Sequence, residues 1–414
     1  MSFLSYKKDY LKGDISSGLV VATLVIPQGI AYALIAGLPP VIGLYTATIP
    51  VLIYLLFGSS PHVSIGPVAI ISILIYSGVT PIAAIGTTEY MEYVLVLTVL
   101  VGVIQFLLSS MKFGVIVEYV PHGVISGFTS GCAVIISMNQ ISEMVKIPLY
   151  DRSNMISSLW MILTHMDEIH VISSIMAILS IIVLILLKKM IPNYPQPIIL
   201  IIISVFCVYL LNLDMYGVAL IGKIPMGMPP LVFPVFTMEK ITSMIPIAIV
   251  IAFIGFIETF AIGKVIAKKE GYSLRSNTEL KSLGLANIVG GFFSAMPVAG
   301  GFSRSAVNYS SGAITKFSSV LSVGIVLVSL IYLTSLFSFI PKVVLSTIIL
   351  LSVIKLIDVK ETAEILRNNV LDGFILLSTF TVTIIAGPKF GLVIGILLSI
   401  LIGMRKVNIS YIEN

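Results

Sequence analysis

Long apolar stretches recur from near residue 14 to near residue 404, separated by short connections rich in polar residues, glycine and proline. Many reach the roughly 17–25 residues that a helix needs to cross the hydrocarbon core of a bilayer. A helix satisfies its backbone polar groups within one segment, as lipid requires. We therefore expect an all-α polytopic membrane protein. The pattern predicts about fourteen helical segments, at residues 14–35, 41–57, 66–77, 92–110, 120–140, 171–187, 196–213, 241–266, 280–296, 303–313, 316–336, 340–354, 370–387 and 389–404.

Two of the predicted segments are too short to cross a bilayer and are interrupted by glycine and proline. The first reads HVSIGPVAIISILIYSG (62–78), and the second is reached through FFSAMPVAGGFSRSAVNYSSGA, about 235 residues later. Short, interrupted segments at matching places in two halves of a chain indicate an inverted-repeat transporter with its binding site at the interruptions. We therefore expect half-helices as segments 3 and 10.

The composition also favours a membrane protein. Of the 414 residues 57% are hydrophobic and 10% are charged, whereas soluble domains carry about 25% charged residues. We expect one transmembrane domain over residues 1–414, surrounded by lipid. The N-terminal sequence MSFLSYKKDYLKGD lacks the features of a cleaved secretory signal.

The basic residues cluster beside the ends of the predicted spans. An even number of spans places both termini on one side, and most lysines and arginines fall on that side. The positive-inside rule then makes this side cytoplasmic. We expect a multi-pass protein of the cell (plasma or inner) membrane with both termini in the cytoplasm.

A helix that begins at mid-membrane leaves its first backbone N–H groups unpaired and presents the positive end of its dipole. Breaks at Gly66-Pro67 and at Gly300-Gly301 would place two such ends in a polar cavity and create an anion site. We expect Pro67 in the first turn of its half-helix. Hydroxyl groups of Ser303 and Ser305 would act as donors beside the second N-terminus or cap it.

Arg304 stands in this second interruption without an acidic residue nearby in the sequence. An unpaired arginine at the bilayer centre costs roughly 2.5–3.5 kcal/mol on insertion scales, and a bound anion would offset that cost. The alternatives are a pairing with a distant glutamate or an extension of the side chain to the membrane interface.

Glu258 is the one acidic residue well inside a strongly apolar segment, FIGFIETFAIGKVIA. A carboxyl group removed from water favours its neutral form, which suits a proton carrier. Sodium would need several oxygen ligands, but the same-face neighbours are Ala261 and Ile262 and Thr259 alone is weak support, so we favour a proton. The alternative is a structural ion pair with Arg304 or Lys264.

Gln28 and Tyr32 are four residues apart in LVIPQGIAYALIAGLPP and share one helix face. Gln28 can donate to an anion, and Tyr32 can form one wall of a pocket. Interhelical packing with a hydrogen bond explains the pair equally well.

Other classes of function find little support. The four histidines have no metal-ligand spacing, and the chain contains neither a G-x-S-x-G motif nor a complete P-loop. We expect neither an enzyme nor a resident cofactor or metal. The basic residues are explained as membrane anchors, so nucleic-acid binding is not expected.

The string IPQGIAYALIAGLPPVIGLYTATIPVLIYLLFGSSPHVSIGPVAIIS (26–72) resembles the signature of the SulP family of anion transporters, which includes sulfate permeases and prestin. The resemblance continues through GFIETFAIGKVIA (255–267) and GGFSRSAV (300–307) and extends over essentially the whole chain. It implies a 7+7 inverted repeat in which a core domain moves as an elevator against a gate domain. The core would comprise residues 14–115 and 241–336, and the gate 116–240 and 337–406.

In that family the anion lies between the N-termini of segments 3 and 10, beside segment 1. Carried over, the resemblance assigns Glu258 to the carboxylate associated with cation coupling. The candidate substrate-binding residues are Gln28, Tyr32, Gly66, Pro67, Val68, Ala69, Phe302, Ser303, Arg304 and Ser305.

Two departures limit the transfer. Many members have phenylalanine where this chain has Val68, so the pocket wall would be less aromatic. Most members also carry a cytoplasmic STAS domain after the last span, which is absent from these 414 residues. A homodimer is implied by the family alone.

The leading hypothesis is a secondary active transporter for a small inorganic or carboxylate anion, namely sulfate, bicarbonate or a dicarboxylate, coupled to protons through Glu258. The alternatives are an uncoupled anion channel or exchanger, and a nucleobase transporter on the same fold. Arg304 favours an anion over a neutral heterocycle.

Overall fold

The computed structural model describes residues 7–114, 122–149, 152, 154–191 and 195–412, and it is mostly helical. The first half contains the 3-10 helices η2 (Lys8–Tyr10) and η4 (Met166–Glu168), strand β1 (Ile65–Gly66) and the helices α1 (Leu11–Ile35), α2 (Pro40–Thr46), α3 (Ile49–Phe57), α4 (Ala69–Val79), α5 (Thr88–Ser110), α6 (His122–Val145), α7 (Met155–Thr164), α8 (Val171–Met190) and α9 (Gln196–Leu211). The second half contains strand β2 (Ala299–Gly300), the 3-10 helix η5 (Ile354–Leu356) and the helices α10 (Met238–Glu270), α11 (Ser276–Phe292), α12 (Phe302–Ser310), α13 (Phe317–Tyr332), α14 (Thr334–Phe337), α15 (Lys342–Val353), α16 (Val359–Asn368), α17 (Val370–Ala386) and α18 (Pro388–Ile412).

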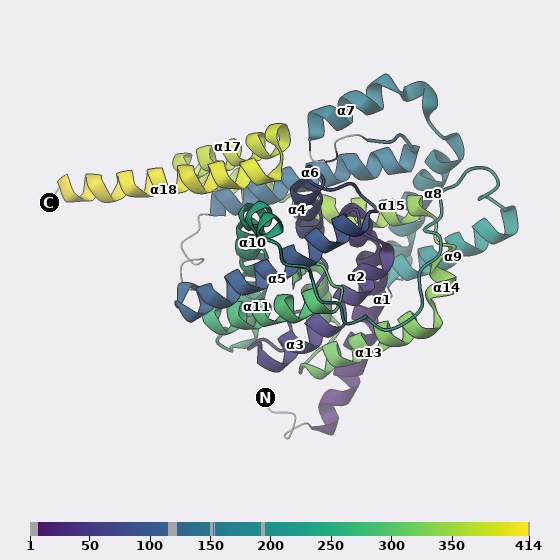
Figure 1. Cartoon of the computed structure of the whole chain (residues 1–414), viewed down its shortest axis with the longest axis horizontal. Helices are drawn as coiled ribbons and strands as arrows, with labels where there is room; N and C mark the ends of the chain where they lie inside the picture. The colour runs from purple at the N-terminus through teal and green to yellow at the C-terminus, as the bar shows by residue number, and fades with distance from the viewer. Residues whose placement is uncertain (1–6, 115–121, 150–151, 153, 192–194, 413–414) are drawn as a thin grey trace.

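The helices pack in two groups (Figure 1). In one group α1 packs against α2 and α13, and α5 packs against α10 and α11. In the other, α6 packs against α15, α17 and α18, and α8 packs against α9 and α15. Contacts of α4 and α10 with α18, and of α1 with α9 and α15, join the two groups.

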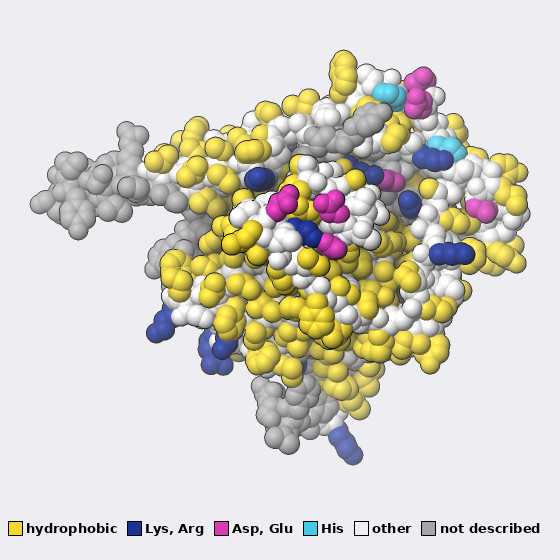
Figure 2. All heavy atoms as spheres, viewed as in Figure 1, with side chains coloured by type: hydrophobic (Ala, Val, Ile, Leu, Met, Phe, Trp, Pro, Cys, Tyr) yellow, Lys and Arg dark blue, Asp and Glu magenta, His cyan; other side chains and the backbone are white. Residues whose placement is uncertain are grey.

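Six helical stretches of the described residues are long and apolar enough to cross a membrane. They are Lys8–Ile35, Pro40–Phe57, Thr88–Ser110, Gly123–Val145, Val171–Met190 and Met238–Glu270. Hydrophobic side chains cover much of the visible surface (Figure 2), as expected of a surface that faces lipid.

The longest helix, α10, has clear end signals. The Thr237 hydroxyl caps its start by accepting the backbone N–H of Lys240, and Gly271 ends it in the left-handed conformation. Its interior from Ile247 to Ala267 is mostly buried. The helix therefore holds its central residues in fixed positions.

Two details differ from the predictions. The predicted segment 41–57 is confirmed as the candidate span Pro40–Phe57, but a break divides it into α2 and α3, and Pro50 lies in the first turn of α3. Pro67 does not lie in the first turn of a helix, because α4 begins at Ala69 with Val68 as its N-cap residue. Pro67 instead belongs to the extended connection between β1 and α4, which leaves its carbonyl group available to a neighbour.

Candidate functional site

The two extended segments that interrupt the helices, β1 and β2, meet at the centre of the first helical group, and we call this place the crossing. The strands β1 and β2 are only two residues long and pair antiparallel, with Ile65 opposite Gly300 and Gly66 opposite Ala299. The half-helices α4 and α12 start directly beyond this crossing. Residues more than 230 positions apart in the sequence are thus brought together, as the repeated Gly/Pro pattern predicted.

The crossing is fixed by buried hydrogen bonds. The Gly301 N–H donates to the Ser64 carbonyl (3.1 Å), and the Ser64 N–H donates to the Ser305 hydroxyl (3.0 Å). The Gly300 N–H donates to the hydroxyl of Thr259 on α10 (2.7 Å). These bonds supply the partners that extended backbone requires when it lies away from water.

The N-termini of both half-helices lack side-chain caps. Val68 and Gly301 are the N-cap residues, and neither side chain caps its helix. The first intrahelical bonds are donated by Ser72 in α4 and by Ser305 in α12. The N–H groups that precede them are therefore free of intrahelical partners, which is the property that makes a helix N-terminus bind anions.

Arg304 lies across the crossing. Its side chain is 2% exposed, and Nη1 donates to the carbonyl oxygen of Pro67 (2.6 Å). Among the described residues, Nε and Nη2 have no hydrogen-bond partner and no ion pair involves Arg304. The guanidinium group therefore presents two buried, unused donors between the half-helices.

Two glycines make room for this guanidinium group. A Cβ atom on Gly301 would lie 2.9 Å from Cζ of Arg304, and one on Gly66 would lie 3.3 Å from Nη2. Gly66 also has a φ of 152°, which side-chain-bearing residues rarely adopt. The glycines predicted as helix breaks thus also permit close approach by the arginine.

Glu258 provides the acidic group of the site. It is 7% exposed on α10, and its Oε2 atom has no hydrogen-bond partner among the described residues. It is close enough to Arg304 for the two charges to influence each other, but no ion pair joins them. The structure therefore contains an acid and a base that are both buried and only partly satisfied.

The two candidates on α1 lie beside the half-helices. Helix α1 contacts both α4 and α12, and Gln28 and Tyr32 are buried on it at 6% and 7% exposure. Among the described residues, neither side chain makes a hydrogen bond. Both polar groups are therefore available to a ligand.

The remaining candidates divide by exposure. Val68 and Ala69 are buried at the start of α4, whereas Phe302 and Ser303 are exposed on the first turn of α12. The predictions that Ser303 or Ser305 caps α12 were wrong, because Gly301 occupies that position. The buried Ser305 hydroxyl is engaged by the Ser64 N–H and so stabilises the crossing.

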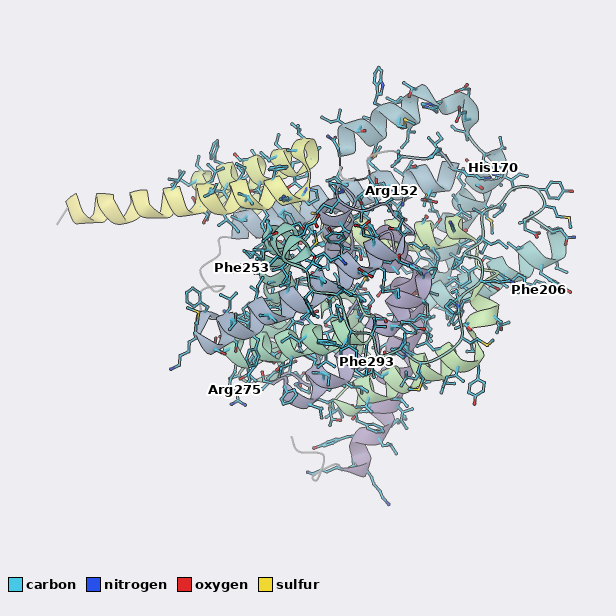
Figure 3. All side chains as sticks on the ribbon, viewed as in Figure 1. Arg152, His170, Phe206, Phe253, Arg275 and Phe293 are labelled. Carbon is cyan, nitrogen blue, oxygen red and sulfur yellow. The ribbon has the colours of Figure 1, made fainter. Side chains whose placement is uncertain are left out.

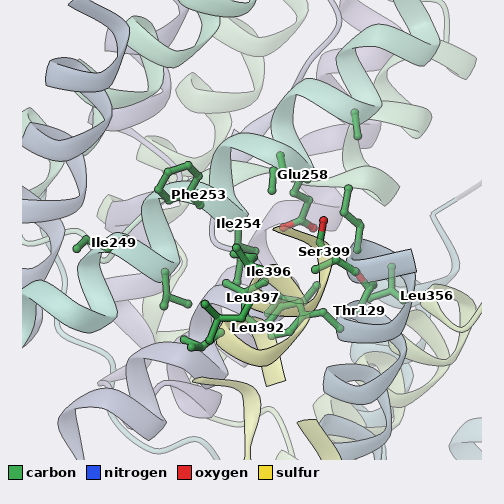
Figure 4. Close-up of a pocket in the computed structure, with 18 of the residues that line it drawn as sticks. Thr129, Ile249, Phe253, Ile254, Glu258, Leu356, Leu392, Ile396, Leu397 and Ser399 are labelled. Atoms are coloured by element: carbon green, nitrogen blue, oxygen red, sulfur yellow. The ribbon is translucent and has the colours of Figure 1, made fainter. Parts of the chain in front are cut away.

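A cavity of about 560 Å³ adjoins the site and separates the two helical groups. On one side it is lined by α4, α10 and Phe302, and on the other by α6, η5 and α18. Its walls are almost wholly apolar, with Glu258, Thr129 and Ser399 as the polar exceptions. Figure 4 shows the carboxyl group of Glu258 pointing toward the hydroxyl of Ser399.

The residues around Glu258 affect whether the coupling ion is a proton or a sodium ion. The Thr259 hydroxyl, the nearest candidate oxygen in the sequence, donates to the Gly255 carbonyl (2.5 Å) and accepts from Gly300. Within the described residues, no cluster of three or more histidine, cysteine or acidic side chains could hold a metal ion. Thr259 is thus a structural residue, a role that its position in the sequence did not reveal.

A polar layer beyond the crossing anchors α12 to its neighbours. The Asn308 amide donates to the His62 carbonyl (2.9 Å) and accepts from the Ser17 hydroxyl of α1 (2.6 Å). The His62 ring packs edge-on against Tyr309 and stacks with Tyr272. The sequence did not reveal these contacts, because the partners are distant along the chain.

The family model of the sulfate permease family matches residues 11–379. The chain belongs to this family. It is 32% identical to sulfate transporter 4.1, chloroplastic, of Arabidopsis thaliana over 396 residues, which is 94% of this chain and 57% of the relative. It is also 32% identical to solute carrier family 26 member 6 of Homo sapiens over 428 residues, covering 98% of this chain and 56% of that one.

Solved structures agree with the fold of this sulfate permease family member. The overall structure of SLC26A9 matches with a TM-score of 0.90 and 25% identity over 97% of this chain and 67% of that chain. The transmembrane domain of the cyanobacterial bicarbonate transporter BicA matches with a TM-score of 0.81 and 21% identity, over 94% and 98% of the two chains. The present chain spans about three fifths of the length of its curated relatives.

Proposed function

We propose that the protein is a secondary active transporter of a small anion, coupled to protons through Glu258. Membership of the sulfate permease family and the names of its relatives support an anion as the cargo. The observation that carries the proposal is the pair of unused, buried donors of Arg304 between two uncapped half-helix N-termini. Sulfate is the first candidate, followed by bicarbonate and dicarboxylates.

The anion would bind to the free N–H groups of α4 and α12 and to Nε and Nη2 of Arg304. The Gln28 amide would donate a further hydrogen bond from α1, and Tyr32 would form a wall. The bond from Nη1 to Pro67 orients the guanidinium group without using its other donors. Binding therefore requires little rearrangement of the charged group.

Proton coupling would follow from competition between the anion and the carboxylate of Glu258 for Arg304. An ionised Glu258 attracts the guanidinium group and repels an anion, whereas a protonated one does neither. Anion binding and protonation of Glu258 therefore favour each other, and thermodynamic linkage makes the effect reciprocal. After the anion and the proton leave, the ionised carboxylate would serve as the counter-ion of Arg304.

The movement proposed is an elevator in a 7+7 inverted repeat. The first helical group would form the moving core, residues 14–115 and 241–336, and the second the gate, residues 116–240 and 337–406. The apolar cavity between the groups supports this division, since its lining offers few hydrogen-bonding groups that would resist sliding. We further propose a homodimer in the plasma or inner membrane with cytoplasmic termini.

The test is uptake of labelled sulfate into proteoliposomes with and without an inward proton gradient. We expect the gradient to drive accumulation in the wild type, and a protonophore to abolish it. Glu258→Gln should retain equilibrative exchange but lose accumulation. Glu239→Gln, an exposed carboxylate on the same helix, is the matched control and should behave as wild type.

Arg304→Ala should weaken anion binding by roughly 10- to 150-fold, the range expected for loss of a charged hydrogen bond. Arg275→Ala is its control, since that exposed side chain lies at the edge of the helical group (Figure 3). The mechanism would be wrong if both site variants left concentrative uptake intact. Current that follows the anion gradient without pH dependence would instead show uncoupled conduction.

A further inference from the structure

Helix α8 differs from the other five candidate spans in how little the protein covers it. Only 22% of its apolar window is buried, whereas the others are 56–72% buried. Its exposed side chains recur at intervals of three and four residues and form one face, which consists of Val171, Ile175, Ile178, Ile182 and Ile185. This face requires an apolar neighbour outside the described chain.

Two lysines follow at the end of this helix. Lys189 lies four positions after Ile185 and continues the exposed face, whereas Lys188 lies four positions after the buried Leu184 and continues the packed face. Both lysines are exposed, and neither makes an ion pair or a hydrogen bond within the described residues.

Helix α15 brings a third lysine to the same place. It packs against α8 (Figure 1), and the two helices start together, because the segment between α9 and α10 bonds to both starts. His170 Nε2 lies 3.0 Å from the Tyr216 carbonyl, and the Lys342 N–H donates to the Ala219 carbonyl (2.9 Å). The 3-10 helix η5 follows α15 directly, and its Lys355 lies close enough to Lys188, near the end of α8, for the two charges to interact.

Within the part of the chain that the structure describes, none of these three lysines forms an ion pair. Partial burial, and then the nearby charge of Lys188, lower the pKa of Lys355. The closest acidic residue in sequence, Asp358, accepts the N–H groups of Lys360 and Glu361 at the start of α16. Glu361 and Glu364 are exposed on α16. Three lysines thus gather where an apolar helix face ends.

We propose that Lys188, Lys189 and Lys355 bind the phosphate headgroup of an anionic phospholipid whose acyl chains lie along the exposed face of α8. Charge complementarity and the continuity of Lys189 with the apolar face favour a lipid over a soluble anion. Basic residues between membrane helices bind anionic headgroups in this way, and each contributes about a five-fold factor in affinity. The lipid would belong to the leaflet on the side of the lysines.

The test is native mass spectrometry of the purified protein titrated with phosphatidylglycerol or phosphatidylcholine. We expect the wild type to retain phosphatidylglycerol preferentially, and excess inorganic phosphate not to displace it. Replacing all three lysines with glutamine should reduce its affinity by roughly 25- to 100-fold. A triple lysine-to-arginine variant should retain binding, which shows that the site tolerates substitution.

The matched control replaces Lys7, Lys8 and Lys12 with glutamine, an equal change in charge at another basic cluster. An equal loss of affinity in this control, or none in the site variant, would overturn the proposal. So would efficient disulfide formation between two copies through Ile182→Cys in a Cys207→Ser background, since a second copy would then cover the face. A photoreactive residue at position 185 should label phosphatidylglycerol in the wild type and not in the triple glutamine variant.

Discussion

Thr259→Val tests how the crossing of the two half-helices is held. Thr259 is 1% exposed, and its hydroxyl both donates to the Gly255 carbonyl and accepts the Gly300 N–H at 2.7 Å. Valine preserves the shape of the side chain but removes the acceptor. The Gly300 N–H then remains buried without a partner, which costs about 1–3 kcal/mol, or roughly a 5- to 150-fold change in the unfolding equilibrium.

Thr242→Val is the matched control. Thr242 lies on the same helix and also donates to the carbonyl four residues earlier, but it is exposed and accepts no N–H from the backbone of the described residues. Its replacement should change stability by less than about 0.5 kcal/mol. The difference between the two variants isolates the bond from Gly300.

Hydrogen–deuterium exchange of the peptide that contains Gly300, together with unfolding in detergent, provides the measurement. Thr259→Val should speed exchange at Gly300 and lower stability, and Thr259→Ser should restore both because the hydroxyl returns. Anion affinity should fall with stability, because the start of α12 and hence Arg304 depend on this strand. Equal behaviour of Thr259→Val and Thr242→Val would refute the reasoning.

Two further predictions follow from the site and its support. Gly66→Ala should weaken anion binding by about ten-fold or more, because the added Cβ would press on Nη2 of Arg304. Gly86 also has a positive φ, but a Cβ there would meet no atom within 4 Å. Gly86→Ala should therefore leave the affinity unchanged in the same binding assay. Burial lowers the pKa of His62 in the folded protein below its ordinary value of 6.5. The contribution of the neutral ring to folding stability is therefore fully present above pH 6.5, and it is lost as the pH falls through the lower pKa of the folded state. Between pH 7.5 and 5.5 the thermal stability of the wild type should therefore fall more than that of His62→Gln, and parallel losses would contradict this role.

The sequence predicted the parts of the site that depend on local pattern. Apolar runs with Gly/Pro interruptions locate half-helices, because length and backbone chemistry limit what lipid accepts. The same reasoning singled out Arg304 and Glu258, since a charged residue inside an apolar segment is costly and therefore marks a candidate functional site. Both proved to be buried beside the crossing.

The parts that were not predicted depend on contacts between distant segments. Nothing local shows that the carbonyl of Pro67 accepts from Arg304, or that the Ser305 hydroxyl accepts from Ser64. The role of Thr259 was likewise hidden, because its partner is 41 residues away. The start of α4 was misplaced for a related reason, since Pro67 is compatible with both a first turn and an extended connection.

The arrangement of donors and acceptors also bears on which anion the proposed transporter would prefer. The half-helix N-termini and Arg304 offer only donors, and Glu258 is the acidic group among them. Fully ionised sulfate has no proton to donate, so it would bind best when Glu258 is protonated. Bicarbonate carries its own hydroxyl and could donate to an ionised Glu258. Competition measured across pH at a fixed concentration of bicarbonate ion should therefore favour sulfate more strongly in acid for the wild type, and this pH dependence should disappear in Glu258→Gln. A pH dependence that persisted in that variant would assign the discrimination to another group.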